Sequence, residues 1–191
     1  MQIHLLDIKH IILTDKLVIR RFKEEDGPKL LDLIQNNRDR LEDQYPHISQ
    51  QVKTTEEATF WVHQKVANWL LQEEYYLAIW NIKTANLMAW VNIHQFDWTI
   101  PSGYFHYFSD KQFEERLELN IALNKIIDFC FEELKLSKIN QLVPADETIA
   151  LRLARNCRFR REGDIRLAFK RGETELIDAI HFGLTPEDIN Y

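Results

Sequence analysis

Apolar side chains recur at helical spacing over residues 118–134 of this 191-residue chain. One face of that segment carries Leu119, Ala122, Leu123, Ile126, Cys130 and Leu134. A 3.6-residue period with a single apolar face is typical of a helix that packs on a sheet. The aromatic segment 102–109 stands just before it and predicts a strand, so a strand, a turn and a helix follow one another here.

The remaining pattern alternates short apolar runs with amphipathic segments and contains no linker or repeat. Strands are predicted at residues 17–22, 75–80, 87–96, 138–143, 159–170 and 174–184, and further helices at 26–41, after a Thr54/Glu57 capping box, and at 146–155. Only the 118–134 helix is expected to connect parallel strands. We therefore predict an α/β (α+β) fold, a mixed, mostly antiparallel central sheet flanked by helices, in a single domain over residues 1–191.

Composition narrows the class of protein. Apolar residues make up 45% of the chain and charged residues 28%, which is typical of a globular protein, and the net charge of −6 disfavours a general polyanion binder. The apolar runs are too short to span a membrane, and Asp7 and Lys9 interrupt the first ten residues, so no signal peptide is expected. Cys130 and Cys157 lie in apolar helical patterns and are expected to be free buried thiols, which favours the cytoplasm.

The turn before the long helix is the most informative segment for function. Such a junction binds phosphate groups when glycines let the anion approach the backbone N–H groups of the helix N-terminus. The turn at residues 111–117 has no glycine, and its glutamates place negative charge where the helix dipole would attract an anion. The simpler interpretation is ordinary capping, with Glu114 and Glu115 on an exposed first turn without a phosphate site.

Several motifs occur in the order and spacing of a known family. They are Leu17, Ile19, Arg20 and Phe22 with Asp26, then Asn37 and Arg38 with Leu41 and Pro46, the helix 122–136, Val143 and Pro144, and the segment 159–163 with Arg166, Gly172 and Asp178. On these motifs the chain resembles the GNAT (GCN5-related) N-acetyltransferases, in the branch that acetylates the N-terminal amines of ribosomal proteins. The resemblance implies the GNAT fold and direct acetyl transfer from acetyl-CoA to a protein N-terminal or small-molecule amine.

The cofactor loop departs from the family's pattern. The family motif Gln/Arg-x-x-Gly-x-Gly/Ala aligns without gaps on residues 114–119. Both small positions are leucines, Leu117 and Leu119, the polar leading residue is Glu114, and Glu115 and Arg116 stand between them. The resemblance therefore comes with a degenerate acetyl-CoA loop.

Other cofactor positions differ as well. Asp146 and Ile149 stand where the family usually has an Asn and a Ser, and Arg158 stands where it has a Gly. These departures from the family's pattern leave two alternative functions. One is weak or absent acetyl-CoA binding, with a binding or regulatory role. The alternative is an active acetyl-CoA-dependent N-acetyltransferase with a divergent clamp, in which Arg155 and Arg158 hold the phosphates by their side chains.

The segment 150–171 is locally basic. It carries Arg152, Arg155, Arg158, Arg160, Arg161, Arg166, Lys170 and Arg171 against Glu162 and Asp164. Such a run binds RNA or an acidic protein face, or it forms a solvated surface that balances acidic helices elsewhere. A protein partner, an amine substrate and an acidic or RNA partner are therefore all open.

Catalytic residues are less well marked. His94 and His106 lie on neighbouring predicted strands and are candidates for a base near neutral pH, although strand histidines are more often half-buried structural residues. The seven histidines show no metal-ligand spacing, so no metal site is predicted.

Overall fold

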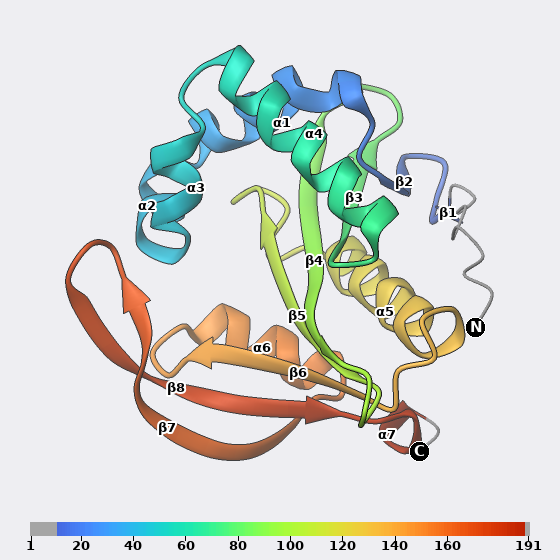
Figure 1. The fold of residues 1–191 in the computed structure, drawn as a ribbon, viewed down its shortest axis with the longest axis vertical. Helices are drawn as coiled ribbons and strands as arrows, with labels where there is room; N and C mark the ends of the chain where they lie inside the picture. The colour runs from blue at the N-terminus through green and yellow to red at the C-terminus, as the bar shows by residue number, and fades with distance from the viewer. Residues whose placement is uncertain (1–10, 190–191) are drawn as a thin grey trace.

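The computed structural model describes residues 11–189 and folds them around one eight-stranded sheet (Figure 1). In spatial order the strands are β1 (Ile11–Ile12), β2 (Leu17–Arg21), β3 (Tyr75–Asn81), β4 (Leu87–Asp97), β5 (Ser102–Ser109), β6 (Lys138–Pro144), β8 (Glu175–Leu184) and β7 (Arg160–Arg171). The helices are η1 (Glu24–Asp26), α1 (Gly27–Asn36), α2 (Arg38–Gln44), α3 (Pro46–Gln51), α4 (Thr55–Leu71), α5 (Leu117–Glu132), α6 (Thr148–Asn156) and α7 (Pro186–Ile189). The expectation about a signal peptide concerns residues 1–10, which lie outside the described residues.

Neighbouring strands are antiparallel except β5 and β6, which run parallel and are joined by α5. The prediction of a mixed, mostly antiparallel sheet flanked by helices is therefore confirmed. The capping box at Thr54 and Glu57 also forms, and it starts α4. Strand β1 was not predicted, and α6 begins at Thr148 rather than at residue 146.

The single helix expected over residues 26–41 is wrong in one respect, because Asn37 divides it. Asn37 leaves the helical conformation (φ −130°, ψ 25°), so α1 ends and α2 begins there. Its side-chain amide donates to the Leu33 carbonyl (2.9 Å), and its Oδ1 accepts the N–H of Lys111 (2.9 Å). Asn and Asp favour such positions because their short side chains bond nearby backbone groups. The break therefore ties α2 to the loop after β5.

Helices cover both faces of the sheet. The apolar face of α5 predicted from the sequence is confirmed, since Leu119, Ala122, Leu123, Ile126 and Cys130 are all buried in one core cluster with the sheet. Helices α1 and α4 form a second cluster on the other face, with side chains such as those of Tyr76, Trp90 and Phe108. Strand β3 contributes alternate residues to the two clusters, which makes it buried on both sides.

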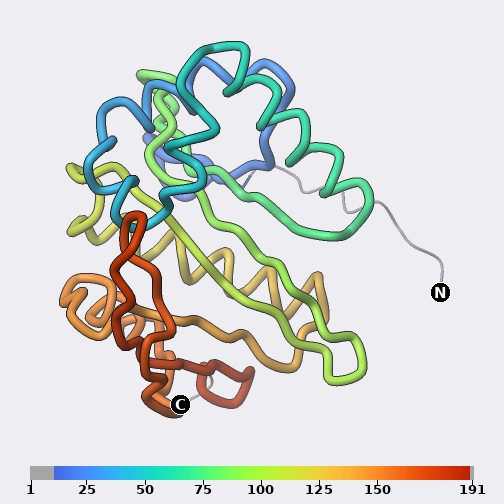
Figure 2. Tube along the Cα trace, turned by 60° about the vertical axis from the view of Figure 1, so that its left-hand side comes forward, coloured from blue at the N-terminus to red at the C-terminus, as the bar shows by residue number. Residues whose placement is uncertain are grey.

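The turn of the C-terminal hairpin β7–β8 lies against α2, as Figure 2 shows from the side. The N–H of Gly172, in the turn of this hairpin, donates to the carbonyl of Asp43 on α2 (3.1 Å). Gly172 has φ +55°, a left-handed conformation that a side chain disfavours. Segments about 130 residues apart in the sequence therefore meet beside the β5–β6 pair.

Candidate functional site

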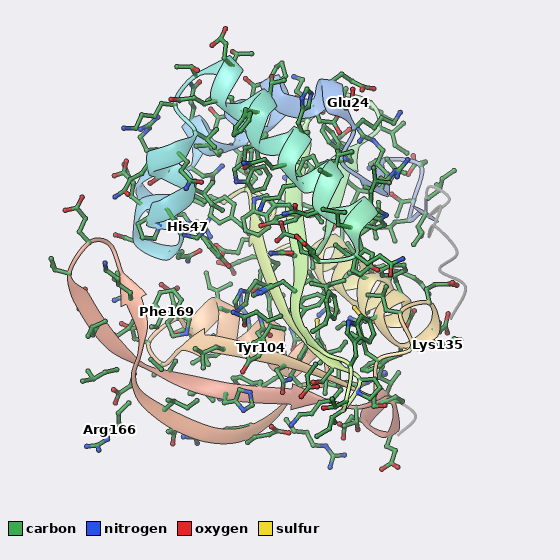
Figure 3. The ribbon with its side chains drawn as sticks, in the orientation of Figure 1. Glu24, His47, Tyr104, Lys135, Arg166 and Phe169 are labelled. Carbon is green, nitrogen blue, oxygen red and sulfur yellow. The ribbon has the colours of Figure 1, made fainter. Side chains whose placement is uncertain are left out.

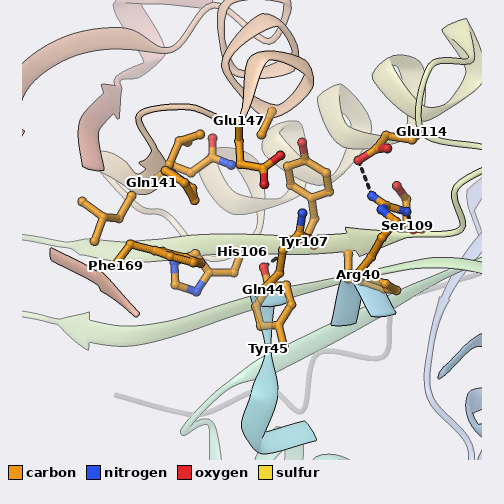
Figure 4. A pocket seen from close by; sticks show the side chains of 15 residues that line it. Arg40, Gln44, Tyr45, His106, Tyr107, Ser109, Glu114, Gln141, Glu147 and Phe169 are labelled. Atoms are coloured by element: carbon orange, nitrogen blue, oxygen red, sulfur yellow. Dashed lines mark hydrogen bonds and ion pairs between the residues drawn. The ribbon is translucent and has the colours of Figure 1, made fainter. Parts of the chain in front are cut away.

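A cleft opens where β5 and β6 diverge. The two strands pair only over residues 102–104 and 138–140, so their later residues leave a gap in the sheet. This gap holds a cavity of about 70 Å³, walled by α2, β5, β6, the turn before α6, and β7 (Figure 4). On a comparable measure, one water needs about 10–15 Å³. The cavity therefore has room for a small chemical group.

The lining of the cleft mixes aromatic, amide and charged side chains. Its residues are Arg40, Gln44, Tyr45, His106, Tyr107, Phe108, Ser109, Glu114, Gln141, Leu142, Val143, Pro144, Glu147, Ala150 and Phe169. Phe169 lies on the side of β7 that faces this space (Figures 3 and 4). A cleft with a few polar groups among apolar walls is the usual form of a ligand site.

The loop between β5 and α5 bonds most of its own backbone. The donors and acceptors are Lys111 N–H to Asn37 Oδ1, Gln112 N–H to Asp110 Oδ1, Phe113 and Glu114 N–H to the Asp110 carbonyl, and Arg116 N–H to the Phe113 carbonyl, over 2.8–3.1 Å. An N–H group that already has an acceptor gains little from a second one. Most N–H groups of the loop itself therefore already have acceptors, whereas no side chain of the described residues caps the first N–H groups of α5.

Glu114 is not on an exposed first turn, and that expectation was wrong. Its side chain is only 15% exposed and forms an ion pair with Arg40 of α2, whose side chain is 22% exposed. Burial raises the pKa of the Glu114 carboxyl, and the charges of Glu147 and Glu115 act in the same direction against Arg40. The sequence could not show this contact, because Arg40 and Glu114 lie on different elements that only the fold brings together.

The other loop residues take different positions. Glu115 is exposed and pairs with Arg152 of α6 (3.0 Å), and Arg116 turns back to donate to the Gln112 carbonyl (2.8 Å). Leu117 is 71% exposed at the start of α5, whereas Leu119 is fully buried in the core. Leu119 is therefore a packing residue as well as a departure from the family motif.

Asp146 and Ile149 lie beside the cleft but differ in role. Both Asp146 carboxylate oxygens accept from Arg171 of β7 (2.8 and 2.9 Å), which lowers the pKa of Asp146. Ile149 packs against the apolar core as a partly buried residue. Arg171 also approaches the cleft residue Glu147 (3.5 Å). The turn after β6 is thus held to β7 by charge.

Arg158 bonds away from the loop, and the role of Arg155 and Arg158 as a phosphate clamp stays a prediction. Arg158 follows α6 and donates to the Ile189 carbonyl near the chain's end (3.0 Å), and Arg155 lies near the end of α6. Arg152, one helical turn before Arg155, is the residue of this run that contacts the loop. Of the basic segment, Arg152, Arg160, Arg161 and Arg171 form ion pairs with acidic residues, so part of its positive charge is neutralised.

His94 and His106 are neighbours on β4 and β5. His94 Nε2 and His106 Nδ1 are 3.0 Å apart, so one ring donates to the other. Burial, and then the charge of His94, lower the pKa of His106 to about 4, and burial also lowers that of His94. His106 lines the cleft and His94 does not. At neutral pH His106 is therefore an uncharged imidazole and a weaker base than free histidine.

Sequence reasoning missed Arg40, Ser109, Gln141, Glu147 and Phe169, which all line the cleft. A partial signal existed for two of them. Ser109 ends the aromatic strand and Glu147 follows the Pro144 strand, and side chains at the ends of neighbouring parallel strands meet at one edge of the sheet. Within residues 11–189 no group of His, Cys, Asp and Glu has the geometry of a metal site, and no helix is long and apolar enough to cross a membrane.

Comparisons with known proteins decide the family. A model of the acetyltransferase (GNAT) domain matches residues 16–160. The chain belongs to the GNAT acetyltransferase family. No curated protein sequence matches it significantly.

Solved GNAT structures share the whole fold. A ribosomal-protein-S5-alanine acetyltransferase from Vibrio fischeri superposes with a TM-score of 0.86 at 16% identity, over 95% of this chain and 98% of that one. A putative ribosomal-protein-serine acetyltransferase from Vibrio cholerae gives 0.73 at 24% identity, over 93% and 98%. RimL, a ribosomal-protein acetyltransferase solved with coenzyme A, gives 0.82 at 16% identity over the same shares. At these identities the likeness concerns the fold.

Proposed function

We propose that this GNAT chain is a binding protein with weak or no affinity for acetyl-CoA. The observation that carries the proposal is the ion pair between Glu114 and Arg40, which draws the leading residue of the family's cofactor motif into the cleft. The ligand we propose is a protein or an amine. The two buried free cysteines support a reducing compartment, and we propose the cytoplasm and a single domain.

The residues of the loop fit a pyrophosphate poorly. Several of its N–H groups are bonded internally, and Leu117 projects at the entrance to α5. Glu114, Glu115 and Glu118 put negative charge at the positive end of the helix dipole. Losing two or three charge-assisted hydrogen bonds of about 1.5–3 kcal/mol each would weaken coenzyme A binding by roughly a thousandfold or more.

The second candidate is an active N-acetyltransferase with a divergent clamp. Family membership favours it, as does His106 in the cleft. Its clamp would be Arg155 and Arg158, with Arg152 added because Arg152 already contacts the loop. An RNA or acidic partner at the basic segment is less well supported, because four of its arginines already have acidic partners.

Calorimetric titration of the purified chain with acetyl-CoA tests the proposal. We expect a dissociation constant weaker than about 1 mM. A dissociation constant near about 10 µM, together with release of coenzyme A thiol in the presence of N-terminal peptides or a polyamine, would overturn the proposal and establish the enzyme. Tight binding without thiol release would also reject it, because the cofactor affinity itself is what we propose to be lost.

A further inference from the structure

Arg40 supplies hydrogen-bond donors at one end of the cleft. Arg40 lies over the ring of Phe108, 5.5 Å from its centroid, and donates to the Ser109 carbonyl (3.1 Å) while it pairs with Glu114. A guanidinium has five N–H donors in a fixed plane, so it suits carboxylate, phosphate and sulfate groups. Figure 4 shows Arg40, Ser109 and Glu114 together at one end of the cleft.

Ser109 adds a second, independent observation. It is 1% exposed, it lines the cleft, and its Oγ has no hydrogen-bond partner among the described residues. A buried hydroxyl without a partner costs free energy, and native structures rarely leave one unless a water or ligand satisfies it. The hydroxyl stands on the same residue whose carbonyl holds Arg40.

The backbone of β5 points the same way. The N–H of Asp110 donates to the Met88 carbonyl on β4 (2.8 Å), so the backbone groups of Asp110 face β4. Along a strand this direction alternates from one residue to the next, so the backbone groups of the residue before Asp110 face β6. The Tyr107 carbonyl accepts from the Tyr45 hydroxyl (2.9 Å) and the Ser109 carbonyl from Arg40, both from the cleft side. The N–H groups of Tyr107 and Ser109 therefore also face the gap that β6 leaves.

We propose that Arg40, Ser109 and the free edge of β5 form an oxyanion-binding site that the chain's own Glu114 carboxylate fills. The ligand class is a small oxyanion, such as a sulfate, phosphate or carboxylate group, and it binds by displacing Glu114. The inference rests on the proposed function in one respect, that acetyl-CoA does not occupy the cleft.

Charges around Glu114 are compatible with such an exchange. Glu114 is paired through one carboxylate oxygen only, and desolvation raises its pKa despite Arg40 and Lys111. Glu147 repels an incoming anion, but Arg171 lies 3.5 Å from its carboxylate and offsets that charge. The bound carboxylate is thus held less firmly than the Arg40 pair alone would suggest, and its release leaves Arg40 without a counter-ion.

The test is calorimetric titration with sodium sulfate at constant ionic strength, with sodium chloride as the balancing salt. Sulfate keeps its charge over the whole pH range used. We expect Glu114→Gln to bind sulfate at least about tenfold more tightly than the unmodified chain, because the competing carboxylate is gone. Glu115→Gln, one residue further along the loop and paired with Arg152, should bind like the unmodified chain. Adding Arg40→Gln to Glu114→Gln should abolish binding.

A pH series on the unmodified chain keeps the test decisive if Glu114→Gln fails to fold. As pH falls from 8 to about 5, Glu114 protonates above the range of an ordinary carboxyl, and sulfate affinity should rise. The charged groups that act on it are Arg40, Lys111, Glu115 and Glu147. His106, with a pKa of about 4, stays mostly neutral at pH 5.

Three results would overturn the site: equal sulfate affinity with and without Glu114, no sulfate binding by Glu114→Gln together with no rise at low pH, or binding that survives the loss of Arg40. These results leave the proposed function untouched. A tight acetyl-CoA complex of the unmodified chain would overturn the proposed function, and with it the premise that the cleft is free for a small oxyanion.

Discussion

Replacing Glu114 with alanine should destabilise the protein far more than replacing Glu115. The Glu114 side chain is 15% exposed and pairs with Arg40 inside the cleft, whereas Glu115 is 65% exposed and pairs with Arg152 at the surface. Removing the partner of a mostly buried charged group lowers the free energy of unfolding by about 1–3 kcal/mol, whereas an exposed ion pair contributes about 0–1 kcal/mol to it. Burial of Glu114 outweighs the attraction of Arg40 for its charge, so the loss comes mainly from leaving Arg40 without its partner, and we expect about 1–2 kcal/mol for Glu114→Ala and under about 0.5 kcal/mol for Glu115→Ala.

Urea unfolding near pH 7.5 measures both free energies, and a double-mutant cycle isolates the pair. Arg40→Ala alone should be destabilising, and the double variant Arg40→Ala with Glu114→Ala should cost less than the sum of the single changes. Equal, small effects of the two glutamate substitutions would refute the reasoning, because that is what an exposed first turn gives. A coupling energy near zero would refute it as well.

Three further outcomes follow from the same structure. Leu123→Ala, on the buried face of α5, should cost about 2–5 kcal/mol in urea unfolding, whereas Ile121→Ala, 39% exposed on the same helix, should cost under about 1 kcal/mol; similar costs would place the core elsewhere. The pKa of Glu114 is raised in the folded protein, so above about pH 4.5 the folded chain keeps a proton that the unfolded chain has released. The free energy of unfolding, relative to that of Glu114→Gln, should therefore fall as pH rises from about 4.5 through the raised pKa. A rise would contradict the assigned direction of the pKa shift. Combining Glu114→Gln, Leu117→Gly and Ile149→Ser should give coenzyme A binding measurable by calorimetry with about 1 kcal/mol of destabilisation, and a folded variant without binding would show that loop chemistry alone does not exclude the cofactor.

Local patterns predicted most of the fold. The α5 stripe, the alternating strands and the Thr54 capping box are local features, and each depends on residues within a few turns or one strand. The division of residues 26–41 was missed because Asn37 breaks the helix through bonds to the loop after β5, 74 residues away. Sequence spacing carries no information about such a partner.

The candidate site could be predicted only in part, for the same reason. The degenerate acetyl-CoA loop at residues 114–119 stays a prediction, and Glu114 at its start lines the cleft. The exposure of Glu114 was predicted wrongly, because the sequence does not reveal that Arg40 faces it. The substitute clamp at Arg155 and Arg158 stays a prediction, and the arginine of that run that contacts the loop is Arg152.

The bond between Gly172 and Asp43 has a consequence for how the protein folds. The walls of the cleft come from α2, β5, β6 and β7. At its edge away from β5, β6 pairs with β8, which is synthesised later than β6. Long-range pairings of this kind form late, because closing a long loop costs entropy before any contact is made. The cleft is therefore among the last parts of the molecule to be assembled. A nascent chain that lacks its final hairpin would carry α5 and its sheet but no complete binding surface.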